Sequence, residues 1–312
     1  MLSKAERRAL RGSKGPWLTA TLLLAVSSFA AAAPPASPLE TVTIEAQRKK
    51  KEIEQQVGHF VSSVPRRYLD DSLSRWNIRI CPLVGGLTHD QGEFFLARLS
   101  QIARDAGAPL AGAKCSPNLY VIVTPEPDDL LKKWYARDRH MFVTRNGMGY
   151  VRDFFASHRP IRVWYNTDFT SDDGAPSISA GLSAALVGTT LQMGFGLDDV
   201  PTNTVQMATR LQRSAVQTFS SVVVIVDANQ IGELNFGQLA DYVGMLALAE
   251  INLDVDVSTM PTILRLFRDR ASPPQALTEL DKAFLFALYS VKQASAAQAP
   301  LMRASMVQHV AP

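Results

Sequence analysis

Residues with the chemistry for catalysis or metal binding are few in this chain and are scattered along it. The stretch QLADYVGMLALAEI, Gln238 to Ile251, has the apolar periodicity of a helix. It carries two carboxylates, Asp241 and Glu250, that could serve as a general base or as a metal ligand. A zinc-binding helix typically holds two histidines four residues apart, whereas no two histidines of this chain are that close. The five are His59, His89, His140, His158 and His309. The sequence therefore predicts no bound metal or other cofactor.

Other short motifs are too incomplete to assign a reaction. The stretch DFTSDDG, Asp168 to Gly174, lacks the alternating ligands and the closing glutamate of a calcium loop, so it is interpreted as a polar turn. The stretch GLSAA, Gly181 to Ala185, differs from the nucleophile motif GxSxG at its last residue. Neither a phosphate-binding P-loop nor a GxGxxG motif occurs. No motif therefore assigns a catalytic residue.

The carboxylate-bearing helix needs a strand before it and a core around it. Gln217 to Asp227 is the most β-branched run in the chain and predicts a central strand. Asn235 is a suitable N-cap for the helix that follows. The predicted core face of that helix consists of Leu239, Tyr242, Val243 and Leu246. A second face forms a stripe of small residues, which would let another element approach closely. This small-residue stripe consists of Gly237, Ala240, Gly244 and Ala247.

Upstream, the apolar patterns predict alternating strands and helices in the order β-α-β-α-β. Asp90 is the predicted N-cap of the first helix, with Glu93 three residues later, and Gly107 ends it. One face of this helix is apolar and carries Phe95, Leu99, Ile102 and Ala106. A second helix is predicted to begin at Asp128. The predicted strands are Trp76–Gly86, Asn118–Thr124 and Arg159–Asn166.

Two segments beyond the carboxylate-bearing helix indicate a family. The stretch LTELDKAFLFALY, Leu277 to Tyr289, carries Thr278 and Asp281 as a capping box. It resembles the closing segment LTxxDxxxLxxLY of metzincins, a group of zincin-class zinc peptidases. The stretch PTILRLF, Pro261 to Phe267, resembles their methionine-turn segment, with a leucine in place of the methionine. The resemblance covers Val222 to Tyr289 and extends to uncharacterised secreted proteins of Gram-negative bacteria with eroded sites. It implies an α/β (α+β), zincin-like fold with a mixed twisted sheet, a central helix of active-site type and C-terminal helices.

The same resemblance implies that the metal site has been lost. Ala240 and Gly244 occupy the positions of the first two zinc-binding histidines. Asp241 occupies that of the general-base glutamate, and Glu250 that of the third ligand. One carboxylate cannot hold a catalytic zinc ion, which needs about three protein ligands. We interpret Asp241 as a helix-surface aspartate and the former metal cavity as closed by packing against the small-residue stripe. The alternative is an ordinary core helix.

The chain is predicted to contain one folded domain between less structured ends. Residues 1–33 have the basic start, apolar run and alanine-rich end of a secretory signal peptide; the alternative is a retained membrane anchor. Residues 34–62 are interpreted as a Pro-rich, charged tether that includes a short β-like piece. Residues 63–290 are predicted to form a single domain, zincin-like by the resemblance, and residues 291–312 a C-terminal tail. The uncharged stretch 174–197 is interpreted as a hairpin or flap over the domain.

Charge and cysteine content favour an oxidising compartment and give no reason to expect a nucleic-acid partner. Residues 1–33 carry a net charge of +4 and the whole chain +3, so the remainder is close to −1. Cys81 and Cys115, the two cysteines, predict a disulfide; the alternative is two separate buried thiols. The predicted location is periplasmic or secreted, with no stable membrane span after removal of the leader.

Three functions are compatible with the sequence, which leaves open whether the protein is an enzyme. The first is a catalytically inert, zincin-like domain that binds an unknown periplasmic or envelope protein in the cleft over the carboxylate-bearing helix. The second is a hydrolase with an unrecognised site, in which the fold brings together Asp241, His158 and Asp227. The third is an envelope assembly factor that binds its partner through the basic tether.

Overall fold

A computed structural model of the chain describes residues 38–66, 72–142, 147–170, 213, 216–232, 234–269 and 271–310; the side chains of 38–44, 147 and 148 are outside this description. The predicted leader and the predicted flap at 174–197 therefore lie outside the described residues. The chain divides into two units, Met1–Ile44 and Glu45–Pro312, and the second contains the sheet and the core. In the described part of the chain, no helix is both long and apolar enough to cross a membrane.

A four-stranded mixed sheet forms the middle of the second unit. Its strands are β1 (Pro82–Gly85), β2 (Leu119–Thr124), β3 (Ile161–Thr170) and β4 (Val216–Asp227), in the spatial order β1-β2-β4-β3. β1, β2 and β4 are parallel, and β3 is antiparallel to β4. The central position predicted for the β-branched run is confirmed, because β4 lies between β2 and β3. The first predicted strand was too long: of Trp76–Gly86, only the last part pairs with β2 as β1.

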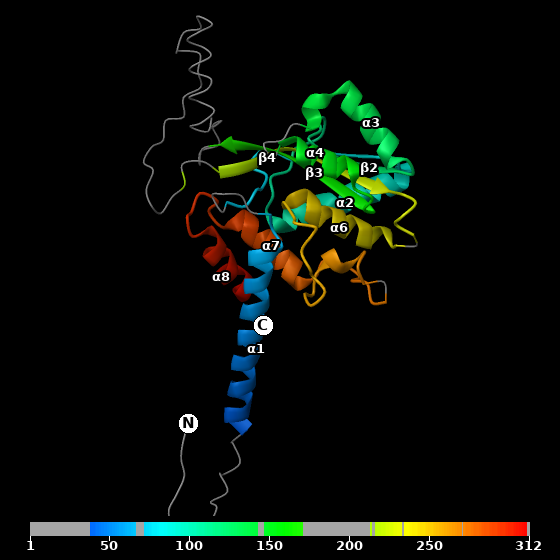
Figure 1. Cartoon of the computed structure of the whole chain (residues 1–312). Helices are drawn as coiled ribbons and strands as arrows, with labels where there is room; N and C mark the ends of the chain where they lie inside the picture. Colours follow the sequence, from blue (N-terminus) through cyan, green and yellow to red (C-terminus); the bar gives the residue numbers. More distant parts are fainter. Residues whose placement is uncertain are drawn as a thin grey trace, which may run out of the picture. The chain divides into compact units, whose positions relative to one another are not determined.

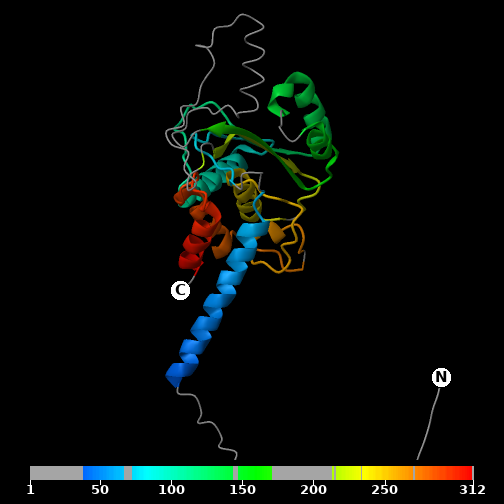
Figure 2. The same cartoon turned by 60° about the vertical axis from the view of Figure 1, so that its left-hand side comes forward.

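Helices cover both faces of this sheet (Figures 1 and 2). On one face lie α3 (Pro127–Arg137), the short 3-10 helix η1 (Arg139–Phe142) and α4 (Gly147–Ala156). On the other lie α2 (His89–Ala106), α6 (Phe236–Leu248) and α7 (Glu279–Ser290). A mixed α/β fold was predicted and is confirmed at this level. Because the sheet is covered on both faces, Ile161 to Tyr165 of β3 are all buried, rather than alternately exposed.

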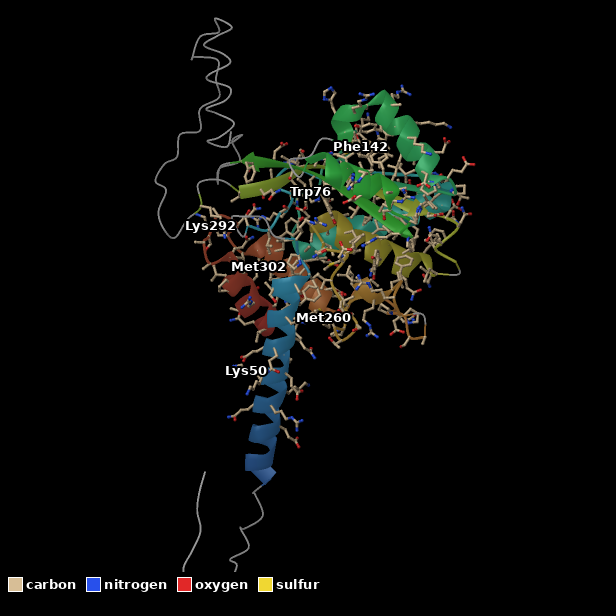
Figure 3. All side chains as sticks on the ribbon, in the orientation of Figure 1. Lys50, Trp76, Phe142, Met260, Lys292 and Met302 are labelled. Atoms are coloured by element: carbon tan, nitrogen blue, oxygen red, sulfur yellow. A yellow bond between two sulfur atoms is a disulfide. The ribbon has the colours of Figure 1, made fainter. Side chains whose placement is uncertain are left out.

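The two faces of β3 belong to two separate hydrophobic clusters. Ile161, Val163 and Tyr165 join the main cluster with α2, α6 and α7. Trp164 points to the opposite face and joins a smaller, aromatic cluster with Phe142. Figure 3 shows Phe142 on the side of the sheet that α3 and α4 cover. The period-two geometry of a strand thus assigns neighbouring residues of β3 to different cores.

The end signals of the helices are partly as predicted. Gly107 ends α2 in the left-handed conformation, with φ of 79°, as the sequence indicated. The start is two residues earlier than predicted, because Thr88 rather than Asp90 is the N-cap and Gln91 Oε1 accepts a hydrogen bond from the Thr88 backbone N–H. Asp90 lies instead in the first turn, where its charge favours the helix dipole.

Residues interpreted as a tether form a helix, α1 (Pro38–Ser63), so the predicted β-like piece is wrong. The physical reason is the spacing of Val57, Phe60 and Val61, which places three apolar side chains on one helix face, with Val64 directly after the end of the helix. All four are fully buried in the main cluster, and the Phe60 ring packs edge-on against that of Phe284 at 5.3 Å. Upstream on the same helix, Lys50 is exposed (Figure 3).

Residues interpreted as a C-terminal tail also contain a packed helix, α8 (Gln298–Val310). α8 packs against α7, and Met302 and Met306 are fully buried in the main cluster. Figure 3 shows Met302 on this helix. The C-terminal segment therefore contributes to the core.

The predicted disulfide between Cys81 and Cys115 is confirmed, with a Cα–Cα distance of 5.9 Å. It links the residue before β1 to the loop before β2, and Asn118 Oδ1 accepts a hydrogen bond of 2.7 Å from the Cys81 N–H beside it. Closing a loop of 34 residues stabilises the fold by roughly 3–4 kcal/mol in the chain-entropy model. The bond therefore holds the start of β1 next to β2.

Candidate functional site

The helix that carries the candidate site residues, α6, is buried along nearly its whole length. Asn235 is its N-cap as predicted, and its side chain accepts a hydrogen bond from the Gly237 N–H. Every residue from Gln238 to Leu248 is buried. Such burial follows from the composition of the helix, which has apolar or small residues on all its faces. Any reactive group on α6 must therefore reach the surface through a neighbouring hollow.

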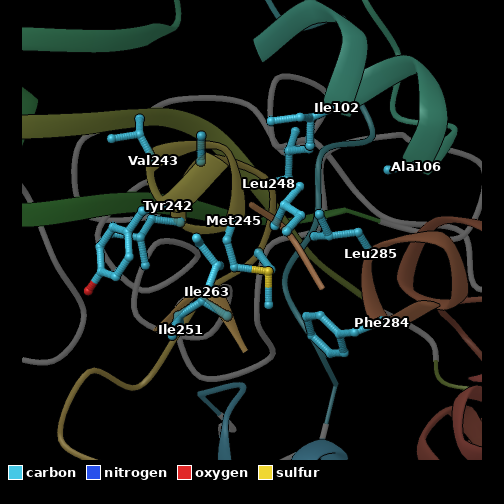
Figure 4. Close-up of a cluster of buried hydrophobic side chains, with 14 of the residues drawn as sticks. Ile102, Ala106, Tyr242, Val243, Met245, Leu248, Ile251, Ile263, Phe284 and Leu285 are labelled. Atoms are coloured by element: carbon cyan, nitrogen blue, oxygen red, sulfur yellow. The ribbon is translucent and has the colours of Figure 1, made fainter. Parts of the chain in front are cut away.

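The small-residue stripe of α6 is in direct contact with α2. A Cβ atom built on Gly244 would lie 2.7 Å from Ile102 Cδ1, so Ile102 fills the space that a larger residue at 244 would need. Ala240 is fully buried as well. Figure 4 shows Ile102 of α2 and Leu285 of α7 close to the side chains of α6. The structure thus has close packing against the stripe at Gly244, whereas the closure of a former metal cavity stays a prediction.

Asp241 is the residue of α6 with the most polar contacts. Its side chain is 1% exposed and accepts two hydrogen bonds from Arg98 of α2, one from Nε at 2.5 Å and one from Nη2 at 2.8 Å. It accepts a third from the Leu277 backbone N–H at 2.8 Å. The hydrogen bond with Asp241 raises the pKa of Arg98. The interpretation of Asp241 as a helix-surface residue is wrong, because the long side chain of Arg98 neutralises it inside the fold.

Glu250 is buried too, but it serves a different contact. Its Oε2 accepts a hydrogen bond of 2.7 Å from Ser74 Oγ, and its Oε1 lies 4.0 Å from Arg66 Nε. Its backbone oxygen accepts a further hydrogen bond from the Arg66 N–H. Glu250 therefore ties the end of α6 to the segments around Arg66 and Ser74.

The donor set of this region does not suit a metal ion. Ala240 and Gly244 offer no side-chain donor, and the oxygens of Asp241 already accept three hydrogen bonds. Among the residues that the structure describes, no group of three or more His, Cys, Asp or Glu could hold a metal. Asp241 and Glu250, the two carboxylates that the resemblance places at metal-site positions, thus make two separate sets of buried polar contacts.

The three residues of the predicted hydrolase site do not meet. His158 and Asp227 line the same hollow of about 500 Å³ near the N-terminus of α3. Asp227 accepts hydrogen bonds from the Asn229 N–H and from Gln230 Nε2. Asp241 is instead held at the contact of α6 with Arg98 and Leu277. The predicted combination of Asp241, His158 and Asp227 is therefore wrong, because α6 packs in the main cluster on one face of the sheet, whereas this hollow lies beside α3, on the other face.

The largest of the hollows described lies along β3, and the sequence alone did not indicate it. It measures about 830 Å³ and is lined by the first half of β3, the end of α4 and the loop after α6. A smaller hollow of about 310 Å³ continues it, and Tyr242 of α6 lines that end. We call these two hollows together the β3 groove. In the described part of the chain, β3 pairs only with β4, so its other edge faces this groove.

The hydrogen-bond register shows which backbone groups of β3 point away from β4. The Asp227 N–H donates to the Pro160 carbonyl, so Ile161 and Val226 form a non-hydrogen-bonded pair. The N–H and C=O groups of Ile161 and Val163 therefore point away from β4 and toward the groove side. The apolar run of β3 predicted burial, but the position of this strand at the sheet edge depends on the tertiary fold.

The walls of the β3 groove combine aromatic rings with arginines. The Arg66 guanidinium lies over the Tyr150 ring, 5.3 Å from its centre, and burial raises the pKa of the Tyr150 hydroxyl. Arg159 is paired with Asp254 at the rim. In the sequence, this site could have been suspected from Arg162, because it is a charged residue inside the apolar stretch IRVWY.

No protein-family model, curated protein or solved structure matches this chain.

Proposed function

We propose that the protein is a binding protein of the periplasm or the extracellular space, with a zincin-like fold and no peptidase activity. The observation that carries this proposal is the ion pair of Arg98 with Asp241. Where the family resemblance implies a general base beside a metal-bound water, this chain has a carboxylate whose hydrogen bonds are all internal. A carboxylate that is 1% exposed and accepts three internal hydrogen bonds is poorly placed to take a proton from a substrate.

The arrangement of the chain supports the zincin-like part of the proposal. A mixed sheet is followed by the buried helix α6, by the turn around Ile263 and then by α7. α7 begins with the capping box that the resemblance implies: the Thr278 side chain accepts from the Asp281 N–H, and Asp281 accepts from the Thr278 N–H. Asp281 also accepts from Ile263 N–H, which fixes the turn before α7. The disulfide supports an oxidising compartment.

The β3 groove is the binding surface of this proposal. A free strand edge beside a hollow is suited to an extended polypeptide, because the added strand pairs with the outward N–H and C=O groups and its side chains enter the hollow. Ile161 and Val163 would supply those backbone groups, and Tyr150, Phe154 and Leu253 the apolar contacts.

The experiment has two parts and uses the full chain with its disulfide intact. The first measures zinc by mass spectrometry and hydrolysis of a casein substrate. We expect neither bound zinc nor cleavage; stoichiometric zinc together with cleavage would reject the inert reading. The second selects linear peptides from a random display library. Hydrogen exchange of Ile161–Tyr165 should slow when a selected peptide is added.

A matched pair of variants localises the binding. Leu253→Asp places a charge in the groove, whereas Leu301→Asp places the same charge on α8, at a side chain that is already 45% exposed. We expect the first variant to lose peptide binding and the second to retain it. Equal binding by both variants, or protection confined to other segments, would show that the β3 groove is not the binding surface.

A further inference from the structure

Arg162 is a buried arginine with unfulfilled hydrogen-bonding capacity. Its side chain is 2% exposed, and its Nη2 lies 2.6 Å from Asp128 Oδ1. Its Nε and Nη1 are buried and have no hydrogen-bond partner among the described residues. A buried guanidinium is stable only when its N–H groups are satisfied, and an unpaired one indicates a water or an ion that completes it. Two of the three guanidinium nitrogens of Arg162 therefore have no hydrogen-bond acceptor among the described residues.

The position of Arg162 shows on which side that acceptor can bind. The side chain lines both the β3 groove and the 500 Å³ hollow near α3. The hollow near α3 is strongly acidic, because its lining includes Glu126, Asp128, Asp129 and Asp227. The lining of the groove instead balances two acidic residues, Asp153 and Asp254, with the arginines Arg66 and Arg159, while His158 lines both hollows. With Arg162 counted in both, the groove lining has one positive charge in excess and the α3 side has three negative charges in excess, so an anion is favoured on the groove side.

The other charges of the groove leave Arg162 as the group best able to hold an anion. Arg159 is paired with Asp254, and Arg66 lies near Glu250. Asp128, the partner of Arg162, is 48% exposed, and contact with Arg162 lowers its pKa. The half-exposed carboxylate can turn into water, whereas the guanidinium cannot leave its buried position, so the pair opens without a large cost only when another anion replaces Asp128. The ion pair can therefore open from the Asp128 side.

We infer that the β3 groove contains an oxyanion-binding site whose buried anchor is Arg162. The ligand group is a carboxylate or a phosphate, since both accept hydrogen bonds from the guanidinium. His158 lies at the junction of the two hollows and Arg66 supplies a second positive charge on the groove side. The inference goes beyond polypeptide binding, because it concerns an anion that can be tested alone.

The test follows the Arg162 Nε–Hε signal by NMR in the full chain. Phosphate and acetate are titrated separately, with chloride at matched ionic strength, and the signal is assigned by its absence in Arg162→Lys. We expect a saturable shift with phosphate or acetate, at a Kd on the order of millimolar, and none with chloride. The stronger of the two anions identifies the ligand group. A signal that does not respond saturably to either anion would overturn the inference.

A second variant guards against a folding defect in Arg162→Lys. Asp128→Asn removes the internal competitor while leaving the arginine in place, and Asp129→Asn is the matched control, since Asp129 pairs with Lys133. We expect Asp128→Asn to tighten anion binding by about tenfold, because a negative charge is removed within ion-pair distance. We expect no change for Asp129→Asn. Unchanged anion affinity in Asp128→Asn would mean that the anion does not bind at Arg162 and would overturn the inference.

Discussion

Arg98 of α2 and Asp241 of α6 form a two-pronged ion pair across the contact between their helices, with distances of 2.5 and 2.8 Å. The pair is unequally buried: the Asp241 side chain is 1% exposed and the Arg98 side chain 36%. The arginine thus reaches from the surface to a carboxylate in the core. The position that resembles a peptidase's general base therefore stabilises the helix packing.

This unequal burial predicts unequal effects of removing each partner. Arg98→Met leaves a buried, uncompensated carboxylate and should lower the free energy of unfolding by about 3–5 kcal/mol. Asp241→Asn leaves a partly exposed arginine and an amide oxygen for the Leu277 N–H, so it should cost about 1–2 kcal/mol. Urea unfolding followed by circular dichroism measures both. Equal losses, or a larger loss for Asp241→Asn, would contradict this reading of the pair.

The contact of Gly244 with Ile102 predicts that a large side chain at position 244 lowers the stability of the fold. Gly244→Leu should destabilise the fold by about 1–3 kcal/mol through overpacking. Adding Ile102→Ala should recover part of that loss, because it removes the side chain that fills the space. The double-mutant cycle is measured by thermal unfolding. Purely additive effects would show that residues 244 and 102 do not share this space.

Gly86 predicts a backbone effect that no side-chain change can relieve. Its φ is +82°, and a Cβ atom there would lie 1.8 Å from the Val123 carbonyl oxygen. Gly86→Ala should therefore cost at least about 3 kcal/mol, since the end of β1 must move away from β2. Gly232 also has a positive φ, +57°, but no heavy atom of the described residues lies within 4 Å of its added Cβ.

Gly232→Ala is accordingly the matched control for Gly86→Ala. It should cost about 1 kcal/mol, the ordinary penalty for a left-handed non-glycine residue. Chemical unfolding of both variants separates the steric clash from the conformational cost. Similar losses would mean that β1 moves away from Val123 easily.

Tyr242 predicts a loss of stability at alkaline pH. Burial raises its pKa from 10 to about 12, so the folded state keeps the hydroxyl protonated. The stability contributed by burying the neutral Tyr242 hydroxyl is complete below pH 10. It falls between about pH 10 and 12, because Tyr242 ionises at a lower pH in the unfolded chain than in the folded one. The loss should be about 1 kcal/mol at pH 11.

Tyr242→Phe should reduce this alkaline loss and change little at neutral pH, since the hydroxyl has no hydrogen bond among the described residues. Unfolding free energies at neutral and alkaline pH, measured before the disulfide reacts, test this. The buried tyrosines Tyr165 and Tyr289 also have raised pKa values, so part of the alkaline loss should remain. An unchanged pH dependence in Tyr242→Phe would contradict the assignment.

The sequence by itself determined the elements that have strong local signals. Signals that depend only on neighbouring residues were predicted correctly. They are the β-branched run of β4, the apolar face of α2 and the caps Asn235 and Thr278. The disulfide was predictable because only one pair of cysteines exists. The helical spacing around Phe60 was also present in α1, but the adjacent charged run led to its interpretation as a linker.

Only the tertiary structure decided the partners of the polar groups. Arg98 is 143 residues before Asp241, and nothing local to either residue specifies that they meet. The separation of His158 and Asp227 from Asp241 likewise depends on how α6 packs under the sheet. The β3 groove exists because β3 lies at one edge of the sheet that the described residues form, which depends on the order of all four strands. Local sequence sets propensity and burial, whereas pairing between distant residues depends on how the whole chain packs.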